Sequence, residues 1–264
     1  MPRRTCSLWR LSSSSGNECR IKLWSAGIGI GFLLATGSAY AGPPFITDDP
    51  EPPPPGGWEI NVPFILERTL GKTEMDTPLF DLNYGLSDIQ LKLEFPIEIL
   101  NEDSNGTRAG PGDSVIGVKW RFFNNEQSQF QLGTYPQVLA PTGNHSRGLG
   151  EGRVAFVLPF LAQKSWEKWT LYGDIAYWWQ GAHEARNYFY AGAVLEREIN
   201  ERLELGVELF GNSPKEHGGR SDVAFNVGGT LKLREHLNLL FSGGRDIVGD
   251  THAMAYIGLQ LLTK

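Results

Sequence analysis

The sequence predicts an all-β protein, a transmembrane up-and-down antiparallel β-barrel of the outer-membrane type with about 12 strands. Apolar residues alternate with polar ones along most of the chain after Trp58. Side chains of a strand point alternately to its two faces, so this pattern predicts strands with one apolar face. The segments are roughly 9 to 13 residues long, enough to cross the hydrocarbon layer when tilted. The connections between them alternate between short and long, as in barrels with tight turns on one rim.

Residues 1–41 have the features of a secretory signal peptide. A basic lead precedes an apolar run that begins at Leu23, and Ala39-Tyr40-Ala41 forms an A-x-A cleavage site. The run is shorter than the roughly 20 residues of a transmembrane helix. Cleavage would remove both cysteines, Cys6 and Cys19, and would make the chain more acidic than its formal charge of −6. An acidic chain is unsuited to nucleic acid, which needs a basic face.

Residues 42–56 are predicted to form a proline-rich N-terminal arm. The four prolines Pro52 to Pro55 favour polyproline II and cannot donate to a sheet, so the first strand is expected to begin at Gly57 or Trp58. Three carboxylates, Asp48, Asp49 and Glu51, lie near the tip. Calcium needs six or more oxygen ligands, so no metal site is predicted there. The arm either enters the barrel as a plug or hangs free.

Residues 57–264 are predicted to form the barrel. In residues 89–99, IQLKLEFPIEI, every odd position is apolar and the even positions are polar or proline. Short connections such as 85–88 and 199–202 alternate with longer ones such as 99–113 and 140–152. Trp166, Trp169, Trp178 and Trp179 are expected near the lipid headgroups. A soluble β-sandwich is the alternative, but so many outward apolar faces would aggregate in water.

The polar alternates are expected to face the lumen. They have two interpretations: a network of ion pairs that fills the barrel, or a polar-lined path for solutes. The lumen-facing candidates are Glu59, Asn61, Asp81, Asn83, Lys92, Glu94, Glu98, Asp174, Glu208 and Arg245.

Enzymatic chemistry has little support in the sequence. His145 lies beside Ser146, and some barrels are lipid hydrolases, but a catalytic triad requires a spatial geometry that adjacency in a loop does not supply. The chain has no G-x-S-x-G motif. No catalytic residue and no cofactor are therefore predicted, and a lipid hydrolase is the least favoured function.

Four segments resemble the outer-membrane transporter family named for the meta-pathway of phenol degradation: AGPPFITDDPEPPPPGGWEIN, LNYGLSDIQLKLEF, GPGDSVIGVKWRFF and APTGNHSRGLGEGR. The resemblance implies a monomeric outer-membrane barrel that admits small solutes, aromatic or hydrophobic compounds among them. Its partners would be outer-membrane lipid, the barrel-assembly machinery and the solute. The chain ends Leu262-Thr263-Lys264, without the terminal aromatic residue usual in such barrels. A structural or adhesion barrel with a closed lumen is the alternative function.

Overall fold

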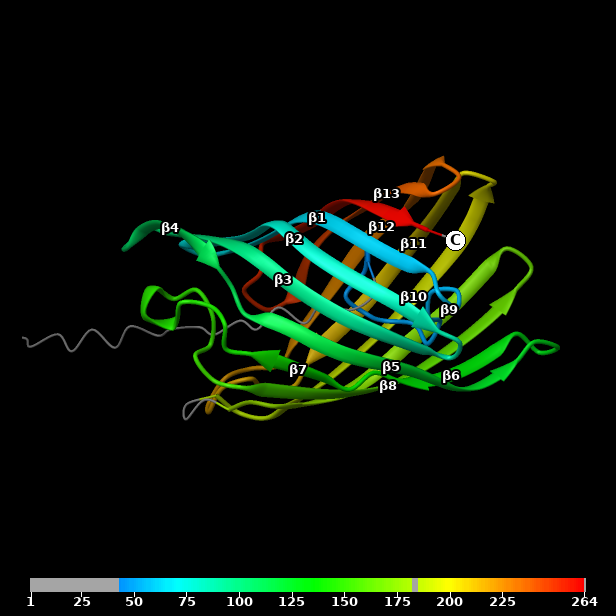
Figure 1. Cartoon of the computed structure of the whole chain (residues 1–264). Coiled ribbons are helices and arrows are strands. Elements are labelled where there is room, and N and C mark those ends of the chain that lie inside the picture. Colours follow the sequence, from blue (N-terminus) through cyan, green and yellow to red (C-terminus); the bar gives the residue numbers. More distant parts are fainter. Residues whose placement is uncertain (1–42, 182–184, 264) are drawn as a thin grey trace, which may run out of the picture. The chain divides into compact units, whose positions relative to one another are not determined.

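The structure, a computed structural model, describes residues 43–181 and 185–263. The predicted signal peptide, residues 1–41, lies outside this range. The described residues form one antiparallel sheet that closes on itself (Figure 1). No helix in the described ranges is long and apolar enough to cross a membrane.

The strands follow one another along the chain, with one short 3-10 helix, His145–Arg147, between β7 and β8. They are β1 (Trp58–Thr69), β2 (Lys72–Leu86), β3 (Ile89–Glu102), β4 (Gly106–Pro111), β5 (Ser114–Asn125), β6 (Phe130–Thr134), β7 (Gln137–Ala140), β8 (Ala155–Trp166), β9 (Trp169–Trp179), β10 (Tyr188–Asn200), β11 (Leu203–Asn212), β12 (Asp222–Arg234), β13 (Leu237–Val248) and β14 (Ala253–Leu262). The first strand begins at Trp58, as predicted.

The barrel has twelve positions around its wall, although fourteen strands are assigned. Both β4 and β5 pair with β3, so together they make one interrupted strand. In the same way β6 and β7 lie end to end between β5 and β8. The last strand, β14, pairs with β1, and the pairing of β3 with β5 closes the circle. The predicted fold class, an up-and-down antiparallel barrel of about 12 strands, is confirmed.

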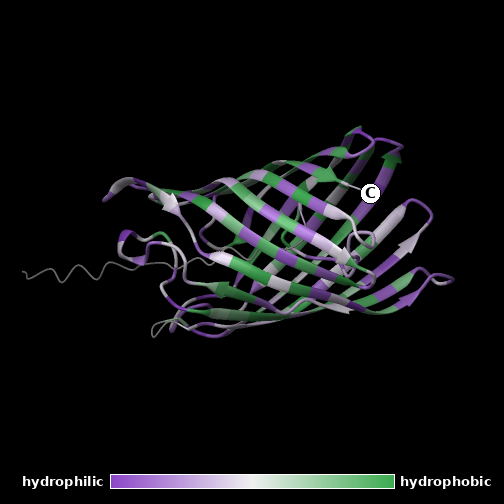
Figure 2. Ribbon diagram, in the orientation of Figure 1, coloured by the Kyte–Doolittle hydropathy of each residue, from purple (hydrophilic) through white to green (hydrophobic). Residues whose placement is uncertain are grey.

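The two faces of the wall reverse the arrangement of a water-soluble protein. On β3, Leu91 and Leu93 are 43% and 44% exposed, whereas Lys92 and Glu94, which alternate with them, are 6% and 1% exposed. Colouring by hydropathy shows this alternation as stripes around the barrel (Figure 2). Apolar side chains turned outward need lipid around them, and a closed sheet leaves no backbone group unpaired in that lipid.

The two rims differ as the sequence predicts, with exceptions on the longer-loop rim. β1 and β2 are joined by only Leu70 and Gly71 on the rim that carries the longer loops. Residues 99–113, predicted as a loop, instead continue the sheet, because Gly106–Pro111 pairs with the end of β3. The connection between β7 and β8 lies against this extension, where Leu149 is fully buried. The longer-loop rim is therefore partly a folded extension of the wall (Figure 1).

Most aromatic side chains lie on the outer face, but one prediction about them is wrong. Trp179 is 40% exposed and packs on Tyr177 and Phe156. Trp178, by contrast, is 5% exposed and stacks on Tyr188 with 5.6 Å between the ring centroids. Consecutive strand residues cannot face the same side, so only one of two adjacent tryptophans can reach lipid.

Candidate functional site in the barrel lumen

The N-terminal arm runs inside the barrel. From Pro43 onward it contacts inward-facing side chains of several strands, and it leaves the lumen where β1 begins (Figure 1). Glu208 of β11 accepts hydrogen bonds from the backbone N–H groups of Ile46 and Thr47, at 2.9 and 2.6 Å. Thr47 and Tyr190 of β10 share a hydroxyl–hydroxyl bond of 2.7 Å. These contacts join segments more than 140 residues apart in the chain.

The three arm carboxylates have different partners. Asp48 is buried and accepts a hydrogen bond from Lys119 Nζ at 2.7 Å, with 4% and 5% of the two side chains exposed. Asp49 folds back to accept the backbone N–H of Glu51 at 2.6 Å. Burial raises the pKa of the half-buried Asp49 carboxyl to about 6, although the nearby Lys119 ammonium opposes this shift. Glu51 accepts from Gln163 Nε2 at 3.5 Å. The two aspartates therefore point to separate partners.

Glycines in the wall make room for the arm. A Cβ atom on Gly192 would lie 2.0 Å from Thr47 Oγ1, and one on Gly133 would lie 2.9 Å from Pro50 Cβ. At Gly85 the equivalent atom would lie 2.2 Å from the carbonyl oxygen of Pro53. Heavy atoms cannot approach so closely, so each glycine provides a depression that a side chain would fill. The shape of the wall and the path of the arm are therefore complementary.

A second set of predicted residues forms a connected polar network on β1, β2 and β3. Lys92 Nζ lies 3.2 Å from Asp81 and 2.7 Å from Glu94. Asn61 donates to both Asp81 and Glu59 at 3.0 Å. Asp81, Lys92 and Glu94 are buried and Glu59 is half-buried, and each has an opposite charge or a hydrogen-bond donor beside it, which is the condition for keeping charged groups in a confined space. Asn83 donates to Asp81 as well and extends the network.

Three further predicted residues, Glu98, Asp174 and Glu208, lie on the inner side of the wall. Glu98 is half-buried beside Gly112, and Asp174 is 7% exposed opposite Gly192 in the ladder between β9 and β10. Glu208 is 2% exposed and also accepts from Asn226 Nδ2 at 2.6 Å.

Arg245 does not belong to the luminal set, and its predicted position is wrong. It lies opposite Phe225 in the ladder between β12 and β13 and is exposed, so its side chain projects from the outer face of the wall. The adjacent pair Gly243 and Gly244 has no side chains to mark the phase of the alternation. The strict two-residue period places Arg245 in line with the outward-facing Phe241 and Ile247.

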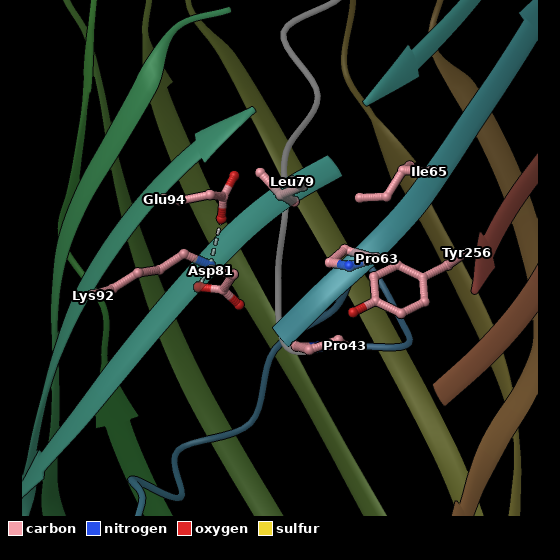
Figure 3. Close-up of a pocket in the computed structure, with 8 residues that line it drawn as sticks. All are labelled: Pro43, Pro63, Ile65, Leu79, Asp81, Lys92, Glu94 and Tyr256. Carbon is pink, nitrogen blue, oxygen red and sulfur yellow. Dashed lines mark ion pairs between the residues drawn. The ribbon is translucent and has the colours of Figure 1, made fainter. Parts of the chain in front are cut away.

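A small recess of about 10 Å³, close to the smallest volume that holds one water molecule, lies where the arm meets this network. Figure 3 shows the Pro43 ring of the arm beside Pro63 of β1 and Tyr256 of β14, with the Lys92–Glu94 ion pair on the opposite side. The lining residues are Pro43, Pro63, Ile65, Leu79, Asp81, Lys92, Glu94 and Tyr256. One side of the recess is thus apolar, and the other side is charged.

Several residues that hold the arm were absent from the predicted set. Lys119 follows the alternation, between the outward-facing Val118 and Trp120, so the two-residue period alone identifies its face. Tyr190 and Tyr172 are less apparent in the sequence. Their strands carry aromatic or apolar residues on both faces, so polarity does not mark the inward side there.

The residues considered for hydrolysis do not face each other. His145 is exposed, and its Nδ1 lies 3.3 Å from the carbonyl oxygen of Gly150. The Ser146 hydroxyl donates to Asn144 Oδ1 at 2.8 Å. Both side chains therefore bond within the loop, and the histidine is not placed to take a proton from the serine.

Comparison with known proteins identifies the family. The model described as "Putative MetA-pathway of phenol degradation" matches residues 57–254, most of the chain. The chain belongs to this family. A search of curated proteins found no match.

Solved structures with the same fold are distant in sequence. An outer-membrane channel from Pseudomonas putida F1 is 18% identical, with a TM-score of 0.67 over 81% of this chain and 98% of its own. The KdgM porin, at 10% identity and TM-score 0.52, and the NanC porin, at 8% and 0.54, each match 76% of this chain and 98% of their own. At such identities the likeness establishes the fold of this family member, an outer-membrane β-barrel.

Proposed function

We propose that the protein is an outer-membrane channel for the passive uptake of small solutes, aromatic and other hydrophobic compounds among them. We also propose that the arm is its plug. The observation that carries both proposals is the way in which the lumen is filled. Its centre is occupied by the arm, which is held by hydrogen bonds and one buried ion pair, and wall glycines keep that space free of side chains. If the arm left, nothing from the strands would replace it at those positions.

Two further points support this function. The inward wall carries paired charges and amides, which tolerate water and polar solutes. The family description names phenol degradation, and the structures reported above are an outer-membrane channel and two porins. We propose no catalytic role. We further propose a monomer inserted by the barrel-assembly machinery, with the arm entering from the periplasmic rim, where the turns are short.

Liposome swelling tests the proposal. Proteoliposomes that contain the protein lacking residues 43–55 should swell in a monosaccharide faster than those that contain the full mature chain, because the plug is gone. Heat-modifiable migration on a denaturing gel would verify that both proteins are folded barrels. A folded, arm-deleted protein that admits no solute would refute the channel and would favour a structural or adhesion barrel with a closed lumen.

A further inference from the structure

The arm inserts an aromatic ring into an apolar seat in the lumen wall. Phe45 is 3% exposed and packs with Tyr172 of β9 and Val194 of β10, which are 7% and 0% exposed. Tyr172 and Val194 are direct partners in the ladder, so they form one continuous surface. We call this surface, together with Gly206 of β11, the ring seat.

The shape of the seat fits an aromatic ring. A Cβ atom on Gly206 would lie 2.8 Å from Phe45 Cζ and 2.9 Å from Cε2, so only a glycine lets the far edge of the ring reach the wall. The same Cβ atom would lie 2.9 Å from Glu196 Cγ, so the Glu196 side chain closes the seat beside Gly206. Tyr172 donates to Glu196 Oε1 at 3.4 Å, so its ring is held beside the seat.

The seat differs in polarity from the neighbouring lumen. The inward side chains near it include Asp174, Glu208 and Asn226, all at least nine-tenths buried. An apolar surface that faces such a lumen would be wetted whenever the arm withdrew, which is unfavourable unless another apolar group takes its place. The seat therefore favours any free ring that can reach it.

A hydrogen-bond acceptor lies next to the seat. Glu208 Oε1 accepts the N–H groups of Ile46 and Thr47, the two residues that follow Phe45. When the arm leaves, this carboxylate loses both donors while remaining bonded to Asn226. Water that enters the lumen would then hydrate the carboxylate, so a solute in the seat that displaces this water without loss must bring a donor of its own. A ring that carries an O–H or N–H group would supply one.

We infer that the ring seat is a binding site for single-ring aromatic solutes that carry a hydrogen-bond donor, and that Phe45 is a tethered occupant which such solutes displace. The inference deepens the proposed function and depends on it for the route by which solute reaches the lumen. Displacement would remove one of the arm's anchors and promote opening by the solute itself. A short tether gives its own ring an effective concentration in the millimolar range, so free solute should compete at millimolar levels.

The test uses phenol as the probe and the full mature protein in detergent. Binding is followed by calorimetry in the wild type, in Phe45→Ala and in Gly206→Leu. Removing the tethered competitor should tighten phenol binding at least tenfold in Phe45→Ala. Filling the seat should abolish binding in Gly206→Leu. Cyclohexanol, which has the hydroxyl group but a puckered ring, should bind Phe45→Ala at least tenfold more weakly than phenol.

Equal phenol affinity in the wild type and Phe45→Ala, or unchanged binding in Gly206→Leu, would overturn the inference. If Gly206→Leu does not fold, Val194→Asn gives the same test, because it places an amide in the seat without a new backbone demand. Failure of the channel proposal is distinguishable. An arm-deleted barrel that is impermeable in liposomes refutes transport, whereas an arm-deleted barrel that is permeable but does not bind phenol refutes the ring seat alone.

Discussion

Asp48→Asn should release the arm without disturbing the barrel. The substitution keeps the shape of the side chain but removes the negative charge 2.7 Å from Lys119 Nζ. In the docked state the lysine would then remain buried, with the Tyr135 ring 5.0 Å away and the Asp49 carboxylate as its remaining nearby counter-charge on the arm. In the released state the lysine would be hydrated.

The size of the effect follows from the burial of this pair. Removing one partner of a buried ion pair costs about 3–5 kcal/mol, and Asp49 keeps the value near the lower end, at about 3 kcal/mol. Because arm release lets water reach Lys119, the cost falls on the docking equilibrium and not on barrel stability. A change of about 3 kcal/mol shifts that equilibrium about 150-fold toward the released state.

Single-channel recording in planar bilayers measures the shift as the ratio of open to closed time. The matched control is Asp88→Asn, which breaks the Asp88–Arg121 pair of 2.8 Å at a site where the Asp88 side chain is 52% exposed. Exposed pairs contribute less than about 1 kcal/mol, so the control should change the ratio little. Equal ratios for Asp48→Asn and the wild type, or equal effects of the two substitutions, would refute this role of the ion pair.

Three further predictions concern the arm and the outer rim. Gly192→Val should expel the arm and raise the single-channel conductance, because a Cβ atom there would lie 2.0 Å from an atom of the arm. Gly243→Ala is the control and should leave the conductance unchanged, because a Cβ atom there has no neighbour nearer than 3.7 Å. Docking should weaken as the pH rises from about 4 through about 6, because the docked Asp49 carboxyl has a pKa of about 6 and so binds its proton more tightly than a free carboxyl, whose pKa is about 3.9. Conductance should therefore rise over that range, and Asp49→Asn should flatten the rise. Leu149→Ala should loosen the fully buried loop contact by about 2–5 kcal/mol, seen as faster proteolysis between β7 and β8 with an intact barrel; an unchanged cleavage rate would contradict this.

The sequence was most informative where its two-residue period was unbroken. Along β3, polarity and position agree at nearly every residue, so the faces of Lys92 and Glu94 follow directly from the period. The period is less readable where glycines or aromatic residues remove the contrast between faces. Arg245 after two glycines, and Trp178 next to Trp179, were therefore placed on the wrong face.

The docking of the arm could not be obtained from the sequence by local reasoning. Its partners, Lys119 and Glu208, lie 71 and about 160 residues away in the chain. Whether a wall glycine is a turn, a bulge or a depression for the arm depends on what packs against it, and that is known only once the barrel closes. Proline content predicted the extended form of the arm, but its position inside the lumen depends on these long-range contacts.

A disulfide between the arm and the wall tests the central claim most directly. Pro50→Cys with Gly133→Cys places two thiols at positions whose Cβ atoms lie 2.9 Å apart, near enough for a bond after a small shift. Single-channel recording of the oxidised double variant should show a persistently closed barrel, and reduction should restore openings. A verified disulfide that leaves conductance as high as in the reduced protein would contradict the proposal that the arm is the plug.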